Sequence, residues 1–331
     1  MGESFVTRIY MNMNLYIFNQ NRRGAVFGVG TYIHELVTAL KDQNINIFVV
    51  NLISDHPQIK KEQIDGVKYW YFPLAIPDQR TINEKEQWNL YYQNVVYLLR
   101  LHIEDKRNLI FHLNFFESGK LAEELKKAFD CQLVAVTHFF DWGFTIYDNP
   151  ERLSRILKQK YPNTLEKRLQ MSFEEEKKYY STVDHIICMT HYMKDILCKN
   201  YGMDIAKISV IPNGLQDISN KLDNMTLRTK WNISAEEKII LFAGRIDEVK
   251  GVIFLIKSFR EVLKNHPNCR LIIAGSGNYD MCFQEAKDIC TKITFTGLLS
   301  KKDLNEIYQI ADIGIVPSLF EPFGYVAIEM M

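Results

Sequence analysis

The stretch K-I-I-L-F-A-G-R-I-D-E-V-K-G-V, residues 238–252, decides the fold class of this chain. It opens with an apolar run that ends in glycine at 244, as expected for a strand buried in a parallel sheet. A short polar loop follows, and a helix is expected over 251–265. A strand, a loop and a helix in this order form the repeating unit of a parallel α/β sheet.

The same unit recurs on both sides of this stretch. Upstream strands are expected at 14–18, 45–53, 67–74, 108–115, 131–138, 183–190 and 207–214, and downstream strands at 269–275, 292–297 and 312–318. Helices are expected at 31–43, 88–105, 121–129, 191–201, 279–290 and 301–310, with a charged helical region over 150–181 interrupted near Pro162. The polar stretch 215–237 breaks this repetition and is expected to connect two domains. The sequence therefore predicts an N-terminal domain over 1–214 and a C-terminal domain over 238–331.

Composition excludes several classes of protein. Hydrophobic residues make up 47% of the chain, which excludes a disordered polypeptide. Lys plus Arg and Asp plus Glu both number 40, so net charge gives no indication of nucleic-acid binding. The six cysteines form no C-x-x-C pair and predict reduced core residues of a cytoplasmic protein. Residues 1–12 lack the apolar core of a secretion signal and precede the first expected strand.

The stretch S-L-F-E-P-F-G-Y-V-A-I-E, residues 318–329, predicts an anion site. Pro322 suits the first turn of a helix and favours an extended conformation at Glu321. The backbone amides of Phe323, Gly324 and Tyr325 would then be free at the positive helix end. Glu329 falls one turn later, where it can accept hydrogen bonds from hydroxyls. The alternative is a pair of solvated glutamates.

Two cations follow the strand that ends at Gly244. Arg245 offers a planar fork of donors and Lys250 a mobile point charge, a combination that suits a diphosphate. The order Lys-Gly-Val differs from that of a Walker A loop. Two surface cations on a loop remain the alternative.

The N-terminal half offers weaker candidates. Gly28 and Gly30 lie between a strand and a helix, but Ile33 stands where a dinucleotide-binding motif has its third glycine. His138 ends an expected strand, where open α/β sheets bind ligands. His112, inside another strand, is interpreted as a packed core residue.

Together these pieces resemble one family. The ordered set is Gly28-Val29-Gly30, His138, V-I-P-N-G at 210–214, G-R-I-D-E-V-K-G at 244–251, A-G-S-G at 274–277, I-T-F-T-G at 293–297 and the 318–329 stretch. It resembles the family-4 retaining glycosyltransferases of the GT-B fold, in which two Rossmann-like doubly wound domains face a cleft. The resemblance covers nearly the whole chain from about residue 13.

The resemblance implies a transfer of sugar from a nucleotide-diphosphate sugar to an acceptor hydroxyl without a metal or another cofactor. It implies that Arg245 and Lys250 hold the diphosphate, that Glu329 binds the ribose and that Glu321 contacts the transferred sugar. The backbone amides of 323–325 would assist in binding the diphosphate and would contact the sugar. His138 would contact a sugar hydroxyl, and Gly28 and Gly30 would shape the phosphate and acceptor side.

Several alternatives stay open. The second domain of the family usually continues beyond this point, so we expect an incomplete C-terminal domain, and an inactive sugar-nucleotide-binding fragment is one alternative. An NAD-dependent Rossmann enzyme is the other. The acceptor is a lipid-linked sugar, a polysaccharide, a metabolite or a peptide. Residues 151–170 carry six Lys or Arg against two Glu, which indicates either a solvated face or peripheral contact with an anionic membrane at its cytoplasmic side.

Overall fold

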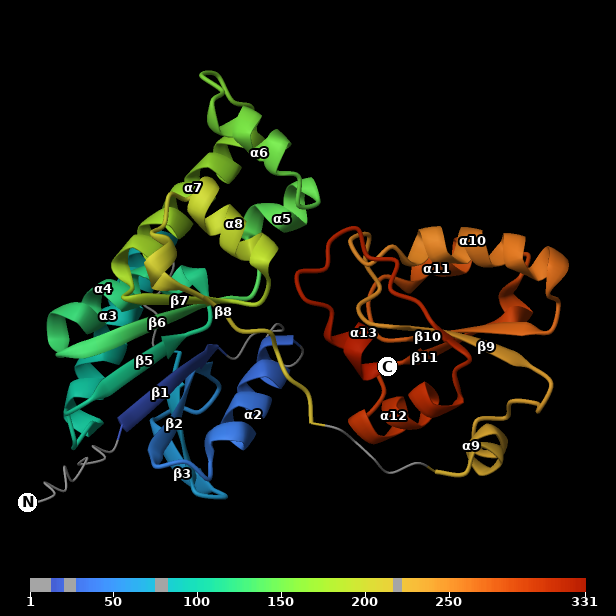
Figure 1. Cartoon of the computed structure of the whole chain (residues 1–331), viewed down its shortest axis with the longest axis horizontal. Helices are drawn as coiled ribbons and strands as arrows, with labels where there is room; N and C mark the ends of the chain where they lie inside the picture. Colours follow the sequence, from blue (N-terminus) through green and yellow to red (C-terminus); the bar gives the residue numbers. More distant parts are fainter. Residues whose placement is uncertain (1–12, 21–27, 75–82, 217–221) are drawn as a thin grey trace, which may run out of the picture. The chain divides into compact units, whose positions relative to one another are not determined.

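The computed structural model describes residues 13–20, 28–74, 83–216 and 222–331. The chain divides into two compact units (Figure 1). Unit 1 comprises the chain up to Trp142 together with Asn149–Gly214, and unit 2 comprises Gly143–Asp148 and Leu215–Met331. Residues 1–12, which precede the first expected strand, and the loop 21–27 before Gly28 lie outside the described residues.

Unit 1 is built on an eight-stranded sheet with the order β3-β4-β2-β1-β5-β6-β7-β8. The strands are β1 (Met13–Gln20), β2 (Ile45–Ser54), β3 (Lys60–Ile64), β4 (Val67–Pro73), β5 (Leu109–Leu113), β6 (Cys131–Thr137), β7 (His185–Cys188) and β8 (Ile208–Val210). All neighbouring pairs are parallel except β3 with β4. The central strand β1 is buried almost throughout, as its run of apolar residues predicts.

Strand β3 was not expected, because its sequence K-K-E-Q-I has no apolar run. It forms a hairpin with β4 through the two residues Asp65 and Gly66, which have φ values of 50° and 83°. A two-residue turn with both φ values positive is the common connection of a hairpin, and Asp-Gly is its usual sequence. The dipeptide was therefore the signal for this strand.

Helices cover unit 1 where the apolar spacing and the charged helical region predict them. They are α2 (Gly28–Leu40), α3 (Glu84–His102), α4 (Gly119–Ala128), α6 (Pro150–Leu157), α7 (Thr164–Thr182) and α8 (His191–Lys199), with short 3-10 turns at Phe116–Ser118 and Ile205–Lys207. The short helix α5 (Asp141–Ile146) was not expected, and its residues are divided between unit 1 and unit 2 after Trp142. The expected interruption near Pro162 is confirmed. Asn163 caps α7, accepting a hydrogen bond from the Glu166 amide while the Glu166 side chain accepts one from the Asn163 amide.

Unit 2 contains a parallel four-stranded sheet with the order β11-β10-β9-β12. Its elements are β9 (Lys238–Ala243), β10 (Cys269–Ala274), β11 (Ile293–Gly297), β12 (Ile313–Gly314), α9 (Asn224–Lys230), α10 (Val252–Asn265), α11 (Tyr279–Glu285), α12 (Lys301–Ile310) and α13 (Tyr325–Glu329), with a 3-10 turn at Cys290–Lys292. The sheet of unit 2, like that of unit 1, places the carboxyl ends of its parallel strands at one edge.

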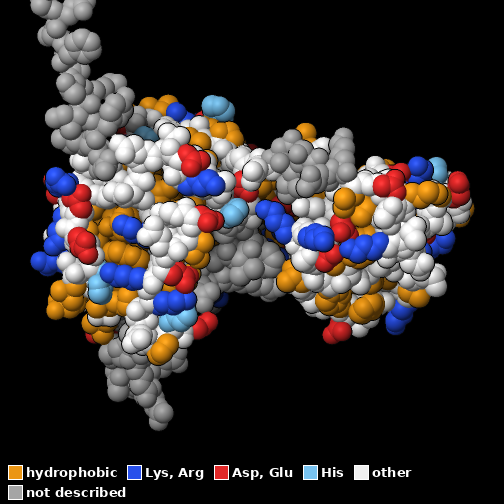
Figure 2. Space-filling model, turned by 90° about the horizontal axis from the view of Figure 1, so that it is seen from below, with side chains coloured by type: hydrophobic (Ala, Val, Ile, Leu, Met, Phe, Trp, Pro, Cys, Tyr) orange, Lys and Arg blue, Asp and Glu red, His pale blue; other side chains and the backbone are white. Residues whose placement is uncertain are grey.

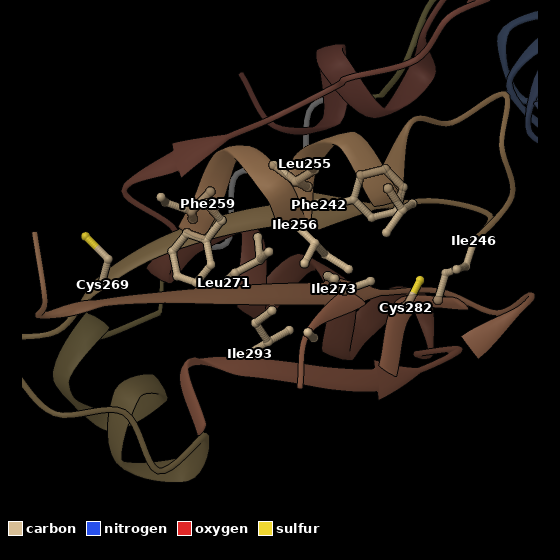
Figure 3. Packing of buried hydrophobic residues seen from close by; sticks show 13 residues of the cluster. Phe242, Ile246, Leu255, Ile256, Phe259, Cys269, Leu271, Ile273, Cys282 and Ile293 are labelled. Atoms are coloured by element: carbon tan, nitrogen blue, oxygen red, sulfur yellow. The ribbon is translucent and has the colours of Figure 1, made fainter. Parts of the chain in front are cut away.

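Both faces of this sheet are covered. Figure 3 shows the face under α10, where Phe242, Leu271 and Ile273 of the strands meet Leu255, Ile256 and Phe259 of the helix. The other face packs against α9 and α12, and its core includes Leu227 and Ile233. The polar stretch 215–237, expected as a connection, therefore contains a helix and core residues of unit 2.

The cysteines are free thiols, as expected. Cys131, Cys188, Cys269 and Cys282 are buried and Cys198 is half-buried, but Cys290 is exposed, so the expectation of a core position is wrong for Cys290. Burial raises the pKa of Cys131 and of Cys188 to about 11, which keeps both as neutral thiols.

Candidate active site

The loops after β9 and β10 pack against each other at the carboxyl edge of the unit 2 sheet. The Ile246 amide donates to the Ser276 carbonyl at 3.0 Å, and the Asn278 amide donates to the Ile246 carbonyl at 2.9 Å. A Cβ on Gly275 would lie 1.7 Å from the Gly244 carbonyl oxygen, and one on Gly277 would lie 2.1 Å from that of Ile246. The A-G-S-G stretch is thus a packing requirement that lets the backbone of the 244–251 loop sit against β10.

The loops after β9 and β12 bring Lys250 and Glu321 together. The Lys250 Nζ lies 2.6 Å from the Glu321 Oε2, which also accepts from the Ser318 hydroxyl at 3.1 Å. The Leu319 amide donates to the Val249 carbonyl at 2.7 Å. Gly251, with φ of 68°, allows this approach, because a Cβ there would lie 2.1 Å from the Pro317 carbonyl oxygen.

Arg245 lies on the same loop as Lys250. Its Nη2 is 3.3 Å from Oδ2 of Asp247, whose Oδ1 accepts from the Lys250 amide at 3.0 Å. Gly244, with φ of 148°, turns the chain out of β9. Asp247 was missed by the sequence analysis. An aspartate three residues before a cation in a tight loop is the signal that could have found it.

The last helix starts later than predicted. Gly324, with φ of 82°, is the residue before α13, so Pro322 and Phe323 precede the helix and Pro322 is not in its first turn. The left-handed conformation of Gly324 interrupts helical geometry, which explains the later start. The rings of Phe323 and Tyr325 meet edge to face at 5.3 Å. The helix has five residues, and the anion site expected at the 323–325 amides stays a prediction.

Glu329 is held by a residue that the sequence did not indicate. Its Oε2 accepts from the Tyr308 hydroxyl of α12 at 2.8 Å. Burial, and then the charge of Glu329, raise the pKa of Tyr308 far above its ordinary value, so the hydroxyl remains a donor. Because Tyr308 lies 21 residues before Glu329 and looks like any helical aromatic, no local pattern could have revealed the contact.

In unit 1, His138 follows β6 and is buried in a polar network. Its Nε2 lies 3.0 Å from Asn114 Oδ1, and the ring of Tyr32 meets it edge to face at 4.8 Å. The Tyr32 hydroxyl lies 3.1 Å from Nε2 of His112. Burial lowers the pKa of His138 to about 3 and that of His112 to about 4, so both imidazoles are neutral at neutral pH.

His112 is buried as expected, but it also belongs to this network. Asn114 donates from Nδ2 to the Phe18 carbonyl at 2.9 Å, which fixes the amide that binds His138. Gly28 and Gly30 lie in the first turn of α2, the helix that carries Tyr32. The rest of the loop that these glycines were expected to shape falls outside the described residues.

The segment after His138 is held by a buried glutamate. Glu176 of α7 accepts at Oε1 from the Asp141 amide at 3.0 Å, and its Oε2 accepts from the Tyr201 hydroxyl. Tyr201 in turn accepts from the Trp142 indole at 3.1 Å. Burial raises the pKa of Glu176 to about 8.

The space-filling view shows blue and red side chains alternating over much of the visible surface (Figure 2), consistent with the equal numbers of acidic and basic residues. Among the described residues, no helix has the length and apolar character needed to cross a bilayer.

The sequence of this chain matches two protein-family models. Residues 26–217, more than half of the chain, match the sequence model of Glycosyltransferase Family 4, and residues 223–331 match that of Glycosyl transferases group 1. A glycosyltransferase of Methanocaldococcus jannaschii is 33% identical over 165 residues, which is 46% of this chain and 42% of that protein. The chain spans less than half the length of this relative, and less than half the length of each of two other curated relatives.

Solved structures show the same fold. The sucrose-phosphate synthase of Thermosynechococcus elongatus has a TM-score of 0.72 at 19% identity, over 96% of this chain and 79% of that one. HepE of Anabaena, in complex with UDP and glucose, has a TM-score of 0.66 at 16% identity, over 96% and 78% of the two chains. The expected GT-B fold is therefore confirmed, and the chain belongs to Glycosyltransferase Family 4.

Proposed function

We propose that this protein is a retaining glycosyltransferase that moves a sugar from a nucleotide-diphosphate sugar to an acceptor hydroxyl. The observation that carries the proposal is the contact between Lys250 and Glu321, which joins the two expected donor-site loops at the strand ends of unit 2. A cation beside a carboxylate suits a ligand in which a diphosphate is joined to a sugar. The UDP and glucose in the HepE structure are consistent with such a donor.

The cations of unit 2 would bind the diphosphate. Arg245 and Lys250 each have a carboxylate partner, Asp247 and Glu321, at 3.3 Å and 2.6 Å. A diphosphate would compete with these carboxylates for the two cations, and charge-assisted hydrogen bonds of this kind are among the stronger ones in proteins. We expect no metal requirement, because the two side chains supply the positive charge that a metal would otherwise supply.

The remaining residues would hold the sugar and the ribose. Glu321, released from Lys250, would accept hydrogen bonds from the transferred sugar. Glu329, oriented by Tyr308, would bind the ribose hydroxyls. The 323–325 amides would assist at the phosphate and the sugar. In unit 1, neutral His138 would hydrogen-bond a sugar hydroxyl, while Gly28 and Gly30 would border the phosphate and acceptor.

The chemistry is a substitution at the anomeric carbon. The bond from this carbon to the phosphate oxygen breaks, and the bond to the acceptor oxygen forms on the same face of the sugar, which retains the configuration. The proton of the acceptor hydroxyl passes to the leaving diphosphate. Arg245 and Lys250 stabilise the charge that develops on that leaving group.

A donor panel tests the proposal. The protein is incubated with UDP-, GDP- and ADP-sugars in the presence of lipid-linked sugars, polysaccharides, sugar metabolites and peptides, and released nucleoside diphosphate is measured. Release by the parent chain and its loss in Lys250→Gln are expected. Failure to bind or release any nucleoside diphosphate would contradict the proposal.

Calorimetry separates the alternatives. Nucleoside diphosphate binding without turnover would indicate the inactive binding fragment, whereas binding of NAD(H) alone would indicate the Rossmann dehydrogenase. Buried Ile33, which stands in place of the third glycine, counts against the dehydrogenase. We also infer a cytoplasmic location, where nucleotide sugars and reduced thiols such as Cys290 are both expected.

A further inference from the structure

The hairpin of α6, the connecting residues 158–163 and the first turns of α7 up to Met171 carries a cluster of cations. They are Arg152, Arg155, Lys158, Lys160, Lys167 and Arg168, and all six are exposed. None of the six forms an ion pair with another residue that the structure describes. Arg260 of α10, by contrast, binds both Glu285 and Asp288. Because the chain has no formal net charge, the cluster is a local excess of positive charge.

The same hairpin exposes large apolar side chains. Tyr161 is 81% exposed, Leu165 47% and Met171 56%. These three side chains lie outside the buried core, to which the same hairpin contributes Leu153 and Leu169 instead.

The hairpin is a built element of unit 1. The Gln170 side chain of α7 donates to the Ile156 carbonyl at 2.8 Å and to the Gln159 carbonyl at 3.1 Å, which ties α6 to α7. Figure 1 shows α6 and the adjoining part of α7 extending beyond the strand ends of the unit 1 sheet.

Two of the cations lie just inside α7. Lys167 and Arg168 directly follow the capping box formed by Asn163 and Glu166. Neither side chain forms a hydrogen bond or an ion pair with another residue that the structure describes. The charges of Lys167 and Arg168 are therefore not used in any described contact within the hairpin.

We propose that this hairpin binds the surface of an anionic phospholipid membrane. The six cations would contact lipid phosphates, while Tyr161, Leu165 and Met171 enter the boundary between headgroups and acyl chains. A nucleic acid would use cations together with stacking rings. Here two of the three exposed apolar residues are aliphatic, which favours lipid. Such contact would place the protein beside a lipid-linked acceptor.

Vesicle flotation tests the proposal. The vesicles are phosphatidylcholine alone or with about 30% phosphatidylglycerol, and the variant is Lys158→Gln/Lys160→Gln/Lys167→Gln. Each cation near an anionic surface is worth roughly a fivefold change in partitioning, so the triple variant should bind on the order of 100-fold more weakly. The parent should bind only the anionic vesicles and should dissociate as salt is raised.

A matched control removes three exposed lysines elsewhere. Lys41→Gln/Lys106→Gln/Lys287→Gln causes the same change in net charge, and Lys41 and Lys106 lie before strands of unit 1, at the opposite edge of its sheet. Near-parental vesicle binding by this control supports the proposal. Equal losses in both triple variants would overturn it, as would vesicle binding insensitive to salt, or binding of poly(U) without binding of vesicles.

A second measurement does not depend on removing charge. Tyr161→Trp places an indole at the exposed tip, and its fluorescence should shift to the blue with anionic vesicles and be quenched by brominated lipid. An indole that stays in water while the protein binds vesicles would show that another surface makes the contact. Neither assay uses a donor, so their failure leaves the proposed glycosyl transfer untouched.

Discussion

Gly251→Ala should be a damaging substitution in unit 2, because Gly251 joins the loops that carry Lys250 and Glu321. Two effects add at this position. Its φ of 68° is in the left-handed region, which costs a residue with a side chain about 1–2 kcal/mol. The new Cβ would also lie 2.1 Å from the Pro317 carbonyl oxygen, so the backbone must move, at about 1–3 kcal/mol. We therefore expect a loss of about 2–5 kcal/mol in the free energy of unfolding of unit 2.

Gly297→Ala is the matched control. Gly297 belongs to the same unit and has φ of 74°, but a Cβ there meets nothing within 4 Å. It should cost only the conformational strain, about 1–2 kcal/mol, so the difference between the two variants isolates the clash with Pro317. Hydrogen exchange of β9 and β10 at increasing urea gives the free energy of unfolding of unit 2 separately from that of unit 1.

Equal destabilisation by the two substitutions, within about 0.5 kcal/mol, would refute the reasoning, because it would show that the loops separate without cost. A second outcome is expected from Gly251→Ala at temperatures where unit 2 stays folded. Nucleoside diphosphate binding should weaken, since the loop that holds Lys250 can no longer rest on residues 317–319. Unchanged binding would show that this contact does not organise the site.

Further predictions concern single side chains. Lys250→Gln should weaken nucleoside diphosphate binding about 10- to 150-fold, which corresponds to the loss of one charge-assisted hydrogen bond. The control Lys257→Gln on α10 should change the binding less than about twofold. Equal losses in calorimetry would contradict the assignment of Lys250 to the diphosphate site. Tyr308→Phe should raise the Kd for the nucleotide about 2- to 10-fold by freeing Glu329, and an unchanged Kd would show that Glu329 needs no such support. Burial raises the pKa of Glu176 from 4.5 to about 8, so the folded state binds the proton more tightly than the unfolded state. Its stabilising contribution is complete below about pH 4.5 and is lost as the pH rises through 8, and Glu176→Gln should flatten that fall in urea titrations. Parental stability that rises over this pH range would contradict the prediction.

Local sequence patterns determined the elements of this protein. The apolar run at 238–243 and the helical spacing after Gly251 are properties of consecutive residues, so the β9–α10 unit follows from sequence. The same holds for the capping of α7 by Asn163. Two local features were interpreted incompletely. The dipeptide Asp65-Gly66 indicated the β3–β4 hairpin, which was not predicted. Gly324 adopts a left-handed conformation, so α13 starts after Pro322 and not at it.

The candidate site depended on tertiary structure, because its partners are distant in sequence. Sequence identified Lys250 and Glu321 one at a time, but they lie 71 residues apart, and their contact exists only because two loops meet at one edge of the sheet. Tyr308 and Asn114 carried no signal, since a helical tyrosine and a strand-end asparagine are ordinary until the fold places them beside Glu329 and His138. Periodicity encodes which face of an element is buried, whereas the identity of a side chain's partner is set by packing between elements.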